Sequence, residues 1–210
     1  MIPLIQNFRT VILANGDFPV HAIPLEFLNN SERIICCDGA ANNLIKNNIL
    51  PNFIIGDLDS INEKYKNDFS NILVLSEDQE TNDLTKAVKF CLDNNWKKIT
   101  ILGATGKRED HTLGNLSLLS DYSETADVQL LTDYGVFNCI FNTNTFESFR
   151  GEQISIFSLE QNSILSSENL RFPIKDRKFS SLWEGTLNES ESDNFTISFE
   201  KGKVLVFREY

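Results

Sequence analysis

Short apolar segments alternate with helix-like segments through most of this chain, and this alternation restricts its possible folds more than any other feature. Six apolar runs of strand length lie between residues 10 and 133: TVILANG, RIICCDG, NFIIGD, NILVLSED, KKITILGAT and DVQLLTD. Between them lie stretches of helical periodicity, most clearly TNDLTKAVKFCLDNN, where Thr81 or Asn82 can cap the helix. Strands that alternate with helices form a mostly parallel sheet with helices on both faces. We therefore expect a Rossmann-like α/β domain over residues 1–135.

The pattern changes after residue 136. The stretches NTFESFRGEQISIFSLEQNSILSSENLRF and NFTISFEKGKVLVFREY alternate polar and apolar residues and contain turn pairs such as Lys201-Gly202. Period-two alternation is typical of strands with one buried face. No strong helical pattern occurs in this part. We expect residues 136–210 to form a second domain, a small β-sandwich.

Charge and composition exclude several classes of protein. The formal net charge of −11 argues against nucleic-acid binding, which depends on basic patches that neutralise phosphates. No segment approaches the roughly 18 apolar residues of a membrane span. The N-terminus lacks the basic start and cleavage site of a secretory signal, so we expect a cytoplasmic protein. The cysteines show no zinc-binding spacing and are expected to be buried, reduced thiols.

Polar residues follow the predicted strands at the point where each strand ends. In an open parallel sheet, ligands bind beyond the carboxyl ends of the strands. Asp57 and Asp59 follow the third strand, and Asp78 and Asp83 follow the fourth. If the chain is still extended at Leu58, both carboxylates of the first pair point to one side while Leu58 turns into the core.

Two interpretations of Asp57 and Asp59 remain open. Converging carboxylates suit Mg²⁺, which prefers oxygen ligands and is held by one or two carboxylates together with substrate phosphates. Alternatively, the two aspartates cap backbone N–H groups in a turn. The nearby acids Asp78 and Asp83 favour the metal.

The segment GATGKREDH supplies the opposite charge. Its glycines permit close approach of the backbone, Lys107 and Arg108 can neutralise phosphate oxygens, and His111 lies where a helix begins. It is not a P-loop, because Arg108 stands where Ser or Thr is required. A plain strand-to-helix turn with solvated charges is the alternative. In the second domain, the ring of Trp183 is able either to stack on an aromatic ligand or to pack in a core.

Five motifs follow one another along the chain: DGAAN (38–42), PNFIIGDLDSI (51–61), DQETNDLTKA (78–87), GATGKREDH (103–111) with Asn115, and GTLN (185–188). Together they resemble the thiamine pyrophosphokinase family, with the middle motifs the most specific. The resemblance implies an α/β catalytic domain, a β-sandwich and a homodimer with active sites at the subunit interface. It implies transfer of the diphosphate group of ATP to the hydroxyl of thiamine, giving thiamine diphosphate and AMP.

The resemblance also implies roles for individual residues. Three acids would hold Mg²⁺ and, with Arg108, act in catalysis: Asp57, Asp59 and Asp83. The ATP site would be lined by Asp38, Gly39, Asn42, Gln79, Thr81, Lys107, Arg108, Asp110 and His111. Thiamine would contact Trp183, Thr186 and Asn188. The chain departs from the family pattern at Ala40 and Lys107, where the family often has glycine, and at Leu187, where it often has serine.

Two other functions are compatible with parts of this pattern. An aspartate-based metal-dependent phosphohydrolase also carries Asp-x-Asp after an apolar strand, but usually after its first strand, whereas here the pair follows the third. A non-enzymatic nucleotide- or thiamine-binding sensor needs only the pocket, without a cluster of acids that holds a metal.

Overall fold

The computed structural model describes residues 5–76, 78 and 80–210. These residues form two compact units, Asn7–Asp133 and Tyr134–Tyr210, with residues 5 and 6 grouped with the second. The sequence predicts a boundary between residues 135 and 136, and the units divide between Asp133 and Tyr134. No sequence pattern indicates that residues 5 and 6 belong with the second unit.

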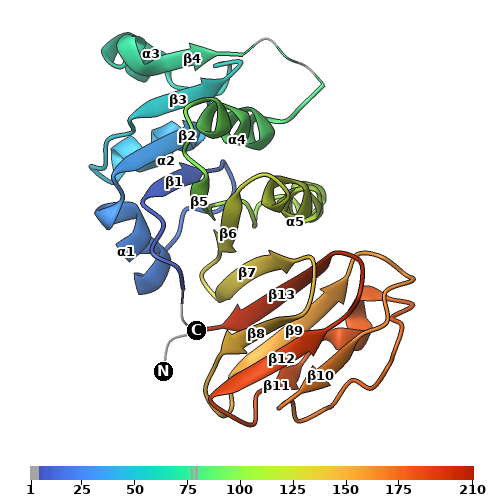
Figure 1. The fold of residues 1–210 in the computed structure, drawn as a ribbon. Helices are drawn as coiled ribbons and strands as arrows, with labels where there is room; N and C mark the ends of the chain where they lie inside the picture. Colours follow the sequence, from blue (N-terminus) through green and yellow to red (C-terminus); the bar gives the residue numbers. More distant parts are fainter. Residues whose placement is uncertain (1–4, 77, 79) are drawn as a thin grey trace. The chain divides into compact units, whose positions relative to one another are not determined.

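The first unit is a parallel sheet with helices on both faces (Figure 1). Its strands are β1 (Thr10–Leu13), β2 (Arg33–Cys37), β3 (Phe53–Gly56), β4 (Leu73–Leu75), β5 (Lys98–Leu102) and β6 (Asp127–Leu131). They stand in the order β6-β5-β1-β2-β3-β4, and every neighbouring pair is parallel. The predicted α/β fold with its mostly parallel sheet is therefore confirmed.

The helices of this unit connect successive strands. They are α1 (Ala22–Asn30), α2 (Ala40–Lys46), α3 (Glu63–Asp68), the 3₁₀ turn η1 (Ser70–Ile72), α4 (Asp83–Asp93) and α5 (Glu109–Ser123). In Figure 1, α1 and α2 lie on one face of the sheet and α4 and α5 on the other. Of the two predicted caps for α4, Asn82 fills the role, since its side chain accepts a hydrogen bond from Thr85 N–H at 2.8 Å.

Continuous apolar runs form the inner strands because both faces of the sheet are covered. Strands β1, β2 and β5 are almost entirely buried. Cys36 and Cys37 of β2 and Cys91 of α4 are buried free thiols, as predicted, whereas Cys139 is only half-buried. Burial raises the pKa of Cys37, so this thiol stays protonated and unreactive.

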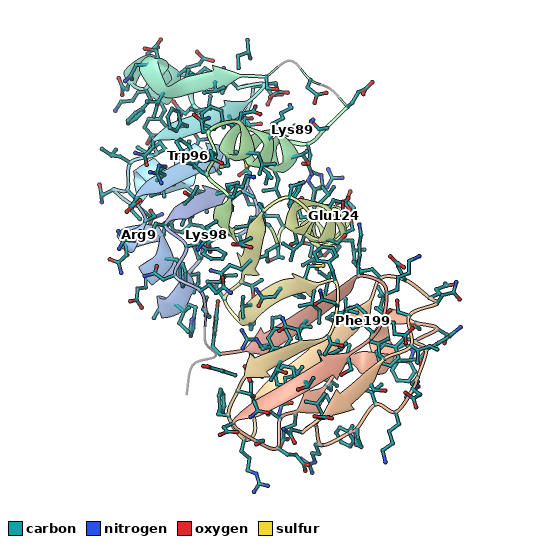
Figure 2. All side chains as sticks on the ribbon, viewed as in Figure 1. Arg9, Lys89, Trp96, Lys98, Glu124 and Phe199 are labelled. Carbon is teal, nitrogen blue, oxygen red and sulfur yellow. The ribbon has the colours of Figure 1, made fainter. Side chains whose placement is uncertain are left out.

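An aromatic cluster fixes the start of β3, the strand whose far end carries Asp57. Phe53 of β3 packs against Phe90 and Trp96, with ring centroids 5.0 and 5.9 Å away. Trp96 is labelled in Figure 2, and the Arg33 guanidinium lies 4.9 Å from its ring centroid. Such contacts add to the area burial of each ring and position the strand.

The second unit consists of two antiparallel sheets around one apolar core. Its strands are β7 (Gly135–Ile140), β8 (Asn144–Glu147), β9 (Gln153–Ser158), β10 (Ser166–Glu168), β11 (Asn188–Glu189), β12 (Asn194–Ser198) and β13 (Val204–Glu209). One sheet has the order β11-β9-β13-β7 and the other β10-β12-β8. Alternate residues of both sheets, such as Ile156 and Phe195, form the core, to which the buried Phe199 labelled in Figure 2 also belongs. The predicted β-rich second domain is confirmed, with one short 3₁₀ helix, η2 (Leu182–Gly185), in addition.

The described helices are all too short or too polar to span a lipid bilayer.

Candidate active site

A pocket of about 490 Å³ lies beyond the carboxyl ends of the parallel strands in the first unit. Residues after β1, β2, β3, β4 and β5 line it, together with residues in the N-terminal halves of α4 and α5. Strand β1 stands between β2 and β5, so the chain order reverses there. Ligands of open α/β sheets bind at such a reversal. Of the predicted site residues that the structure describes, eight line this pocket: Asp38, Asp57, Asp59, Thr81, Asp83, Lys107, Arg108 and His111.

Asp57 and Asp59 are brought together by a turn and not by an extended strand. Strand β3 ends at Gly56, and Leu58 has a left-handed φ of 63°. Leu58 is half-buried, so the expectation that it turns into the core is wrong. Asp59 N–H donates to Asp57 Oδ1 at 3.3 Å, which makes Asp57 a turn cap as well as a pocket carboxylate. The capping interpretation therefore holds for Asp57, and it leaves the second carboxylate oxygen of this residue available to a cation.

Asp38 is the third carboxylate that meets this pair. Oxygen atoms of Asp38, Asp57 and Asp59 all lie within 4.8 Å of one another. Asp38 is buried; its Oδ2 accepts a hydrogen bond from Ser60 N–H at 3.0 Å, while Oδ1 has no hydrogen-bond partner among the described residues. Burial raises the pKa of the Asp38 carboxyl, and the bond from Ser60 offsets part of this rise. Three hard oxygen donors with one buried oxygen unsatisfied fit a divalent cation such as Mg²⁺.

Asp83 lines the same pocket but is paired with a cation of the protein. Its Oδ1 lies 3.0 Å from Nζ of Lys86, one helical turn further along α4. Lys86 is buried and also lines the pocket. Removing either partner would leave a charge without its counterion, so the two act as a unit. The sequence did not single out Lys86.

Asp78 and Thr81 form a hydrogen-bonded pair at the edge of the pocket. The Thr81 hydroxyl donates to Asp78 Oδ2 at 2.5 Å, and this bond lowers the pKa of the Asp78 carboxyl. Lys89 of α4, labelled in Figure 2, lies 3.7 Å from the same carboxylate. The predicted ATP contact Gln79 lies outside the described residues.

The two basic residues after β5 are held in different ways. Lys107, with a left-handed φ of 58°, donates from Nζ to the backbone oxygen of Asn15 at 2.9 Å. Arg108 is the residue before the first turn of α5 and forms two bonds to Asp110 within that turn. The Arg108 guanidinium lowers the pKa of Asp110 to about 2. Both basic side chains and His111 line the pocket. The carboxylate of Asp110 accepts hydrogen bonds from Arg108 and from His111 N–H.

The loop after β1 forms a wall of the pocket that the sequence interpretation missed. Asn15 and Gly16 line it, and Gly16 N–H donates to Gly103 O at 2.7 Å. Asn115 of α5 ties the same region to Ala104 O at 2.8 Å. The signal was present, because the first strand is followed by Asn15-Gly16-Asp17, polar residues and glycine like those after the other strands.

Gly39 and Asn42, predicted to line the ATP site, do not line this pocket. A Cβ at Gly39 would lie 2.7 Å from Nδ2 of Asn15 and 3.1 Å from Cβ of Ser60. Gly39 therefore permits three loops to approach one another. Both polar groups of the Asn42 side chain are engaged with the backbone of residues 60 and 62.

Replacing Gly16 by alanine is expected to destabilise the first unit by about 1–3 kcal/mol. The new Cβ would lie 2.3 Å from Thr105 O and 2.4 Å from Gly103 O, both backbone atoms, so the two loops must separate. Urea unfolding followed by circular dichroism measures the change. The control is Gly114→Ala in α5, where an added Cβ meets none of the neighbouring described atoms within 4 Å and helix propensity favours alanine by about 1 kcal/mol. Equal shifts for both variants would contradict the loop contact.

The predicted thiamine contacts lie in the second unit and differ in exposure. Trp183 is 73% exposed, and Thr186 is half-buried with its hydroxyl donating to Trp183 O at 2.7 Å. Asn188 is buried: its Nδ2 donates to Phe172 O at 2.8 Å, and its Oδ1 accepts from Phe172 N–H at 3.1 Å. Its amide thus serves the fold of this unit, and contact with a ligand stays a prediction for all three residues.

Comparisons with known proteins agree on one family. Residues 25–130 match the family described as thiamin pyrophosphokinase, catalytic domain, and residues 135–207 match thiamin pyrophosphokinase, substrate-binding domain. The chain belongs to the thiamin pyrophosphokinase family. The resemblance inferred from the five motifs is therefore confirmed, and neither the phosphohydrolase nor the sensor has support in these matches.

Sequence relatives match about half of this chain, whereas a solved structure matches nearly all of it. Thiamine pyrophosphokinase 1 of Oryza sativa subsp. japonica is 33% identical over a match that covers 49% of this chain and 48% of the relative. Thiamin pyrophosphokinase 1 of Caenorhabditis elegans is 31% identical, with 50% and 46% covered. The matches thus span about half the length of these curated relatives. The crystal structure of thiamine pyrophosphokinase from Bacillus subtilis has the same fold, with a TM-score of 0.80 at 22% identity over 95% of this chain and 98% of that one.

Proposed function

We propose that this chain is a thiamine diphosphokinase, which transfers the diphosphate group of ATP to the hydroxyl of thiamine. The thiamine oxygen attacks the β-phosphorus, the bond between that phosphorus and the α–β bridging oxygen breaks, and AMP leaves. The hydroxyl proton passes to a base, so the products are thiamine diphosphate, AMP and a proton. Family membership supports this assignment, and the observation that carries it is a pocket lined both by the carboxylates of Asp38, Asp57 and Asp59 and by basic side chains that include Lys107 and Arg108.

The carboxylates are proposed to hold Mg²⁺ with ATP as co-substrate. Asp57 and Asp59 are the predicted ligands; the separation of no more than 4.8 Å supports Asp38 as their companion. Asp83 stays a predicted ligand, although its pairing with Lys86 reduces the negative charge that it offers. When bound, the cation supplies neutralisation of phosphate charge in the transition state.

The other pocket residues have complementary tasks in this proposal. Lys107 and Arg108 neutralise phosphate oxygens, and the bonds that hold each side chain limit its reorganisation. Thr81 and His111 contribute hydrogen bonds from the pocket wall. One of the three acids Asp57, Asp59 and Asp83 orients or deprotonates the thiamine hydroxyl.

Trp183 is proposed to stack on thiamine, and its replacement by alanine is expected to raise KM for thiamine by about tenfold with kcat little changed. Since the side chain is 73% exposed, its loss removes little packing within the chain. Steady-state kinetics with thiamine as the varied substrate measure the effect. Ile164→Ala, at another exposed apolar position of the second unit, is the control. An unchanged KM in Trp183→Ala would remove Trp183 from the thiamine site.

We further propose that the protein is a homodimer with its active sites at the subunit interface. We also propose that it is located in the cytoplasm. Light scattering coupled to size-exclusion chromatography tests the first statement, and fractionation of cells tests the second. A monomer at assay concentration that retains full activity would contradict the dimeric active site.

Phosphorus NMR of the purified protein with Mg-ATP, with and without thiamine, tests the reaction. Formation of AMP and thiamine diphosphate together, only when thiamine and metal are both present, is the expected result. Formation of ADP would indicate transfer of a single phosphoryl group. Release of free phosphate without thiamine would indicate hydrolysis, and either result would overturn the proposal.

A further inference from the structure

We propose that Asn42 is a positioning residue for the metal-binding turn and not a contact of the nucleotide. This inference rests on the proposed function, since it assigns a cation to the Asp57–Asp59 turn. It also differs from the sequence prediction, which placed Asn42 in the ATP site. The hydrogen-bond partners of the Asn42 amide nitrogen and oxygen favour the positioning role.

The amide of Asn42 bridges α2 and the segment that follows β3. Its Nδ2 donates to Ser60 O at 2.9 Å, and its Oδ1 accepts from Asn62 N–H at 2.9 Å. One donor and the carbonyl oxygen of the side chain are therefore used within the protein. Asn42 does not line the carboxylate pocket; with Ser60, Asn62 and Tyr65 it lines a separate hollow on the same unit.

Ser60 is the residue through which Asn42 acts on the carboxylates. Its N–H donates to Asp38 Oδ2 at 3.0 Å, its carbonyl accepts from Asn42, and its hydroxyl donates to Asp59 Oδ1 at 2.8 Å. Every polar group of Ser60 is thus engaged, and the carboxylate of Asp59 is oriented by the last of these bonds. The backbone of Ser60 is held by two side chains, Asp38 and Asn42, and loss of the Asn42 bond removes one of the two.

The turn needs such anchors because its backbone is strained. Leu58, between the two metal-binding aspartates, has a φ of 63°, which a branched side chain adopts only when surrounding contacts enforce it. Two side chains supply such contacts just after the turn. Asp38, which precedes α2, accepts from Ser60 N–H, and Asn42, within α2, accepts from Asn62 N–H. Removing a hydrogen bond that orients a metal ligand typically lowers metal affinity by about 10–100-fold.

Binding of Mn²⁺ to the free protein, measured by electron paramagnetic resonance, tests the inference without requiring turnover. Asn42→Ala is expected to weaken Mn²⁺ binding by about tenfold or more and to leave KM for ATP at saturating metal within about twofold of wild type. Alanine favours the helix at this position of α2, so unfolding of the helix does not account for such a loss. Asn42→Leu, which keeps the side-chain volume without the amide, provides a second variant with the same expectation.

Asn43→Ala is the matched control, since Asn43 is the next residue of α2 and takes no part in either bond to residues 60 and 62. It is expected to bind Mn²⁺ as the wild type does. Unchanged Mn²⁺ affinity in both Asn42 variants would overturn the inference, and a raised KM for ATP with unchanged Mn²⁺ affinity would show a nucleotide contact instead. A wild-type protein that binds no Mn²⁺ would overturn it too. A wild type that binds Mn²⁺ but transfers no diphosphate would overturn the proposed function and leave the Mn²⁺ comparison to decide the role of Asn42.

Discussion

Asp57→Asn is expected to lower kcat/KM for diphosphate transfer by at least about a hundredfold while the protein folds normally. Asparagine retains an oxygen that can accept the bond from Asp59 N–H, which is 3.3 Å long in the wild type, so the turn keeps its internal cap. The substitution removes the negative charge that a cation requires from this ligand. The rate of AMP formation over a range of Mg²⁺ concentrations measures the loss, and Mn²⁺ binding measures its cause.

Asp93→Asn is the matched control for Asp57→Asn. Asp93 is an exposed aspartate at the last position of α4 and does not line the pocket. Its replacement changes the net charge by the same amount, so it separates a local metal effect from a general electrostatic one. The metal role of Asp57 would be refuted if kcat/KM of Asp57→Asn stayed within about threefold of the control.

The fold could be predicted from sequence because two different periodicities divide the chain. Buried runs such as Ile34–Cys37 and Ile99–Leu102 need cover on both faces, and helices that alternate with them along the chain provide this cover on both sides of a parallel sheet. Period-two segments in the second unit, such as Phe195 and Ile197, predict a sheet with one buried face. Ligand sites at the carboxyl ends of the strands follow from topology, so the order of elements along the chain is enough to group Asp57, Asp83 and Lys107.

Local sequence patterns do not determine which way individual polar side chains turn. The extended geometry assumed at Leu58 failed because a left-handed residue reverses the chain there, and nothing in the local pattern required this. Asn42 and Asn188 carry the residue type expected of ligand contacts, yet both amides bond to backbone groups of the protein. Short polar side chains bond to nearby backbone as readily as to ligands, so their role depends on tertiary distances. Lys86 was missed because a lysine in an amphipathic helix usually faces solvent.

Phe195→Ala is expected to destabilise the second unit by about 3–5 kcal/mol, the largest stability effect predicted for this chain. Phe195 of β12 is fully buried, and its ring stacks on Phe146 of the paired strand β8 with centroids 5.0 Å apart. Alanine removes the ring and leaves a cavity between the two sheets, because strands on both sides are held by their own backbone bonds. Urea unfolding by circular dichroism, with hydrogen exchange of the β8 and β12 peptides, measures the loss and locates it.

Phe172→Ala is the control for the loss of a phenylalanine ring. Phe172 is 60% exposed, so its truncation is expected to change the free energy of unfolding by less than about 1 kcal/mol. A loss in Phe195→Ala no larger than in Phe172→Ala would mean that the two sheets collapse onto the vacated space. In that event faster exchange would still be expected in β8, since Phe146 would have lost the ring on which it stacks. Unchanged exchange in β8 together with unchanged stability would contradict the placement of Phe195 at the centre of this core.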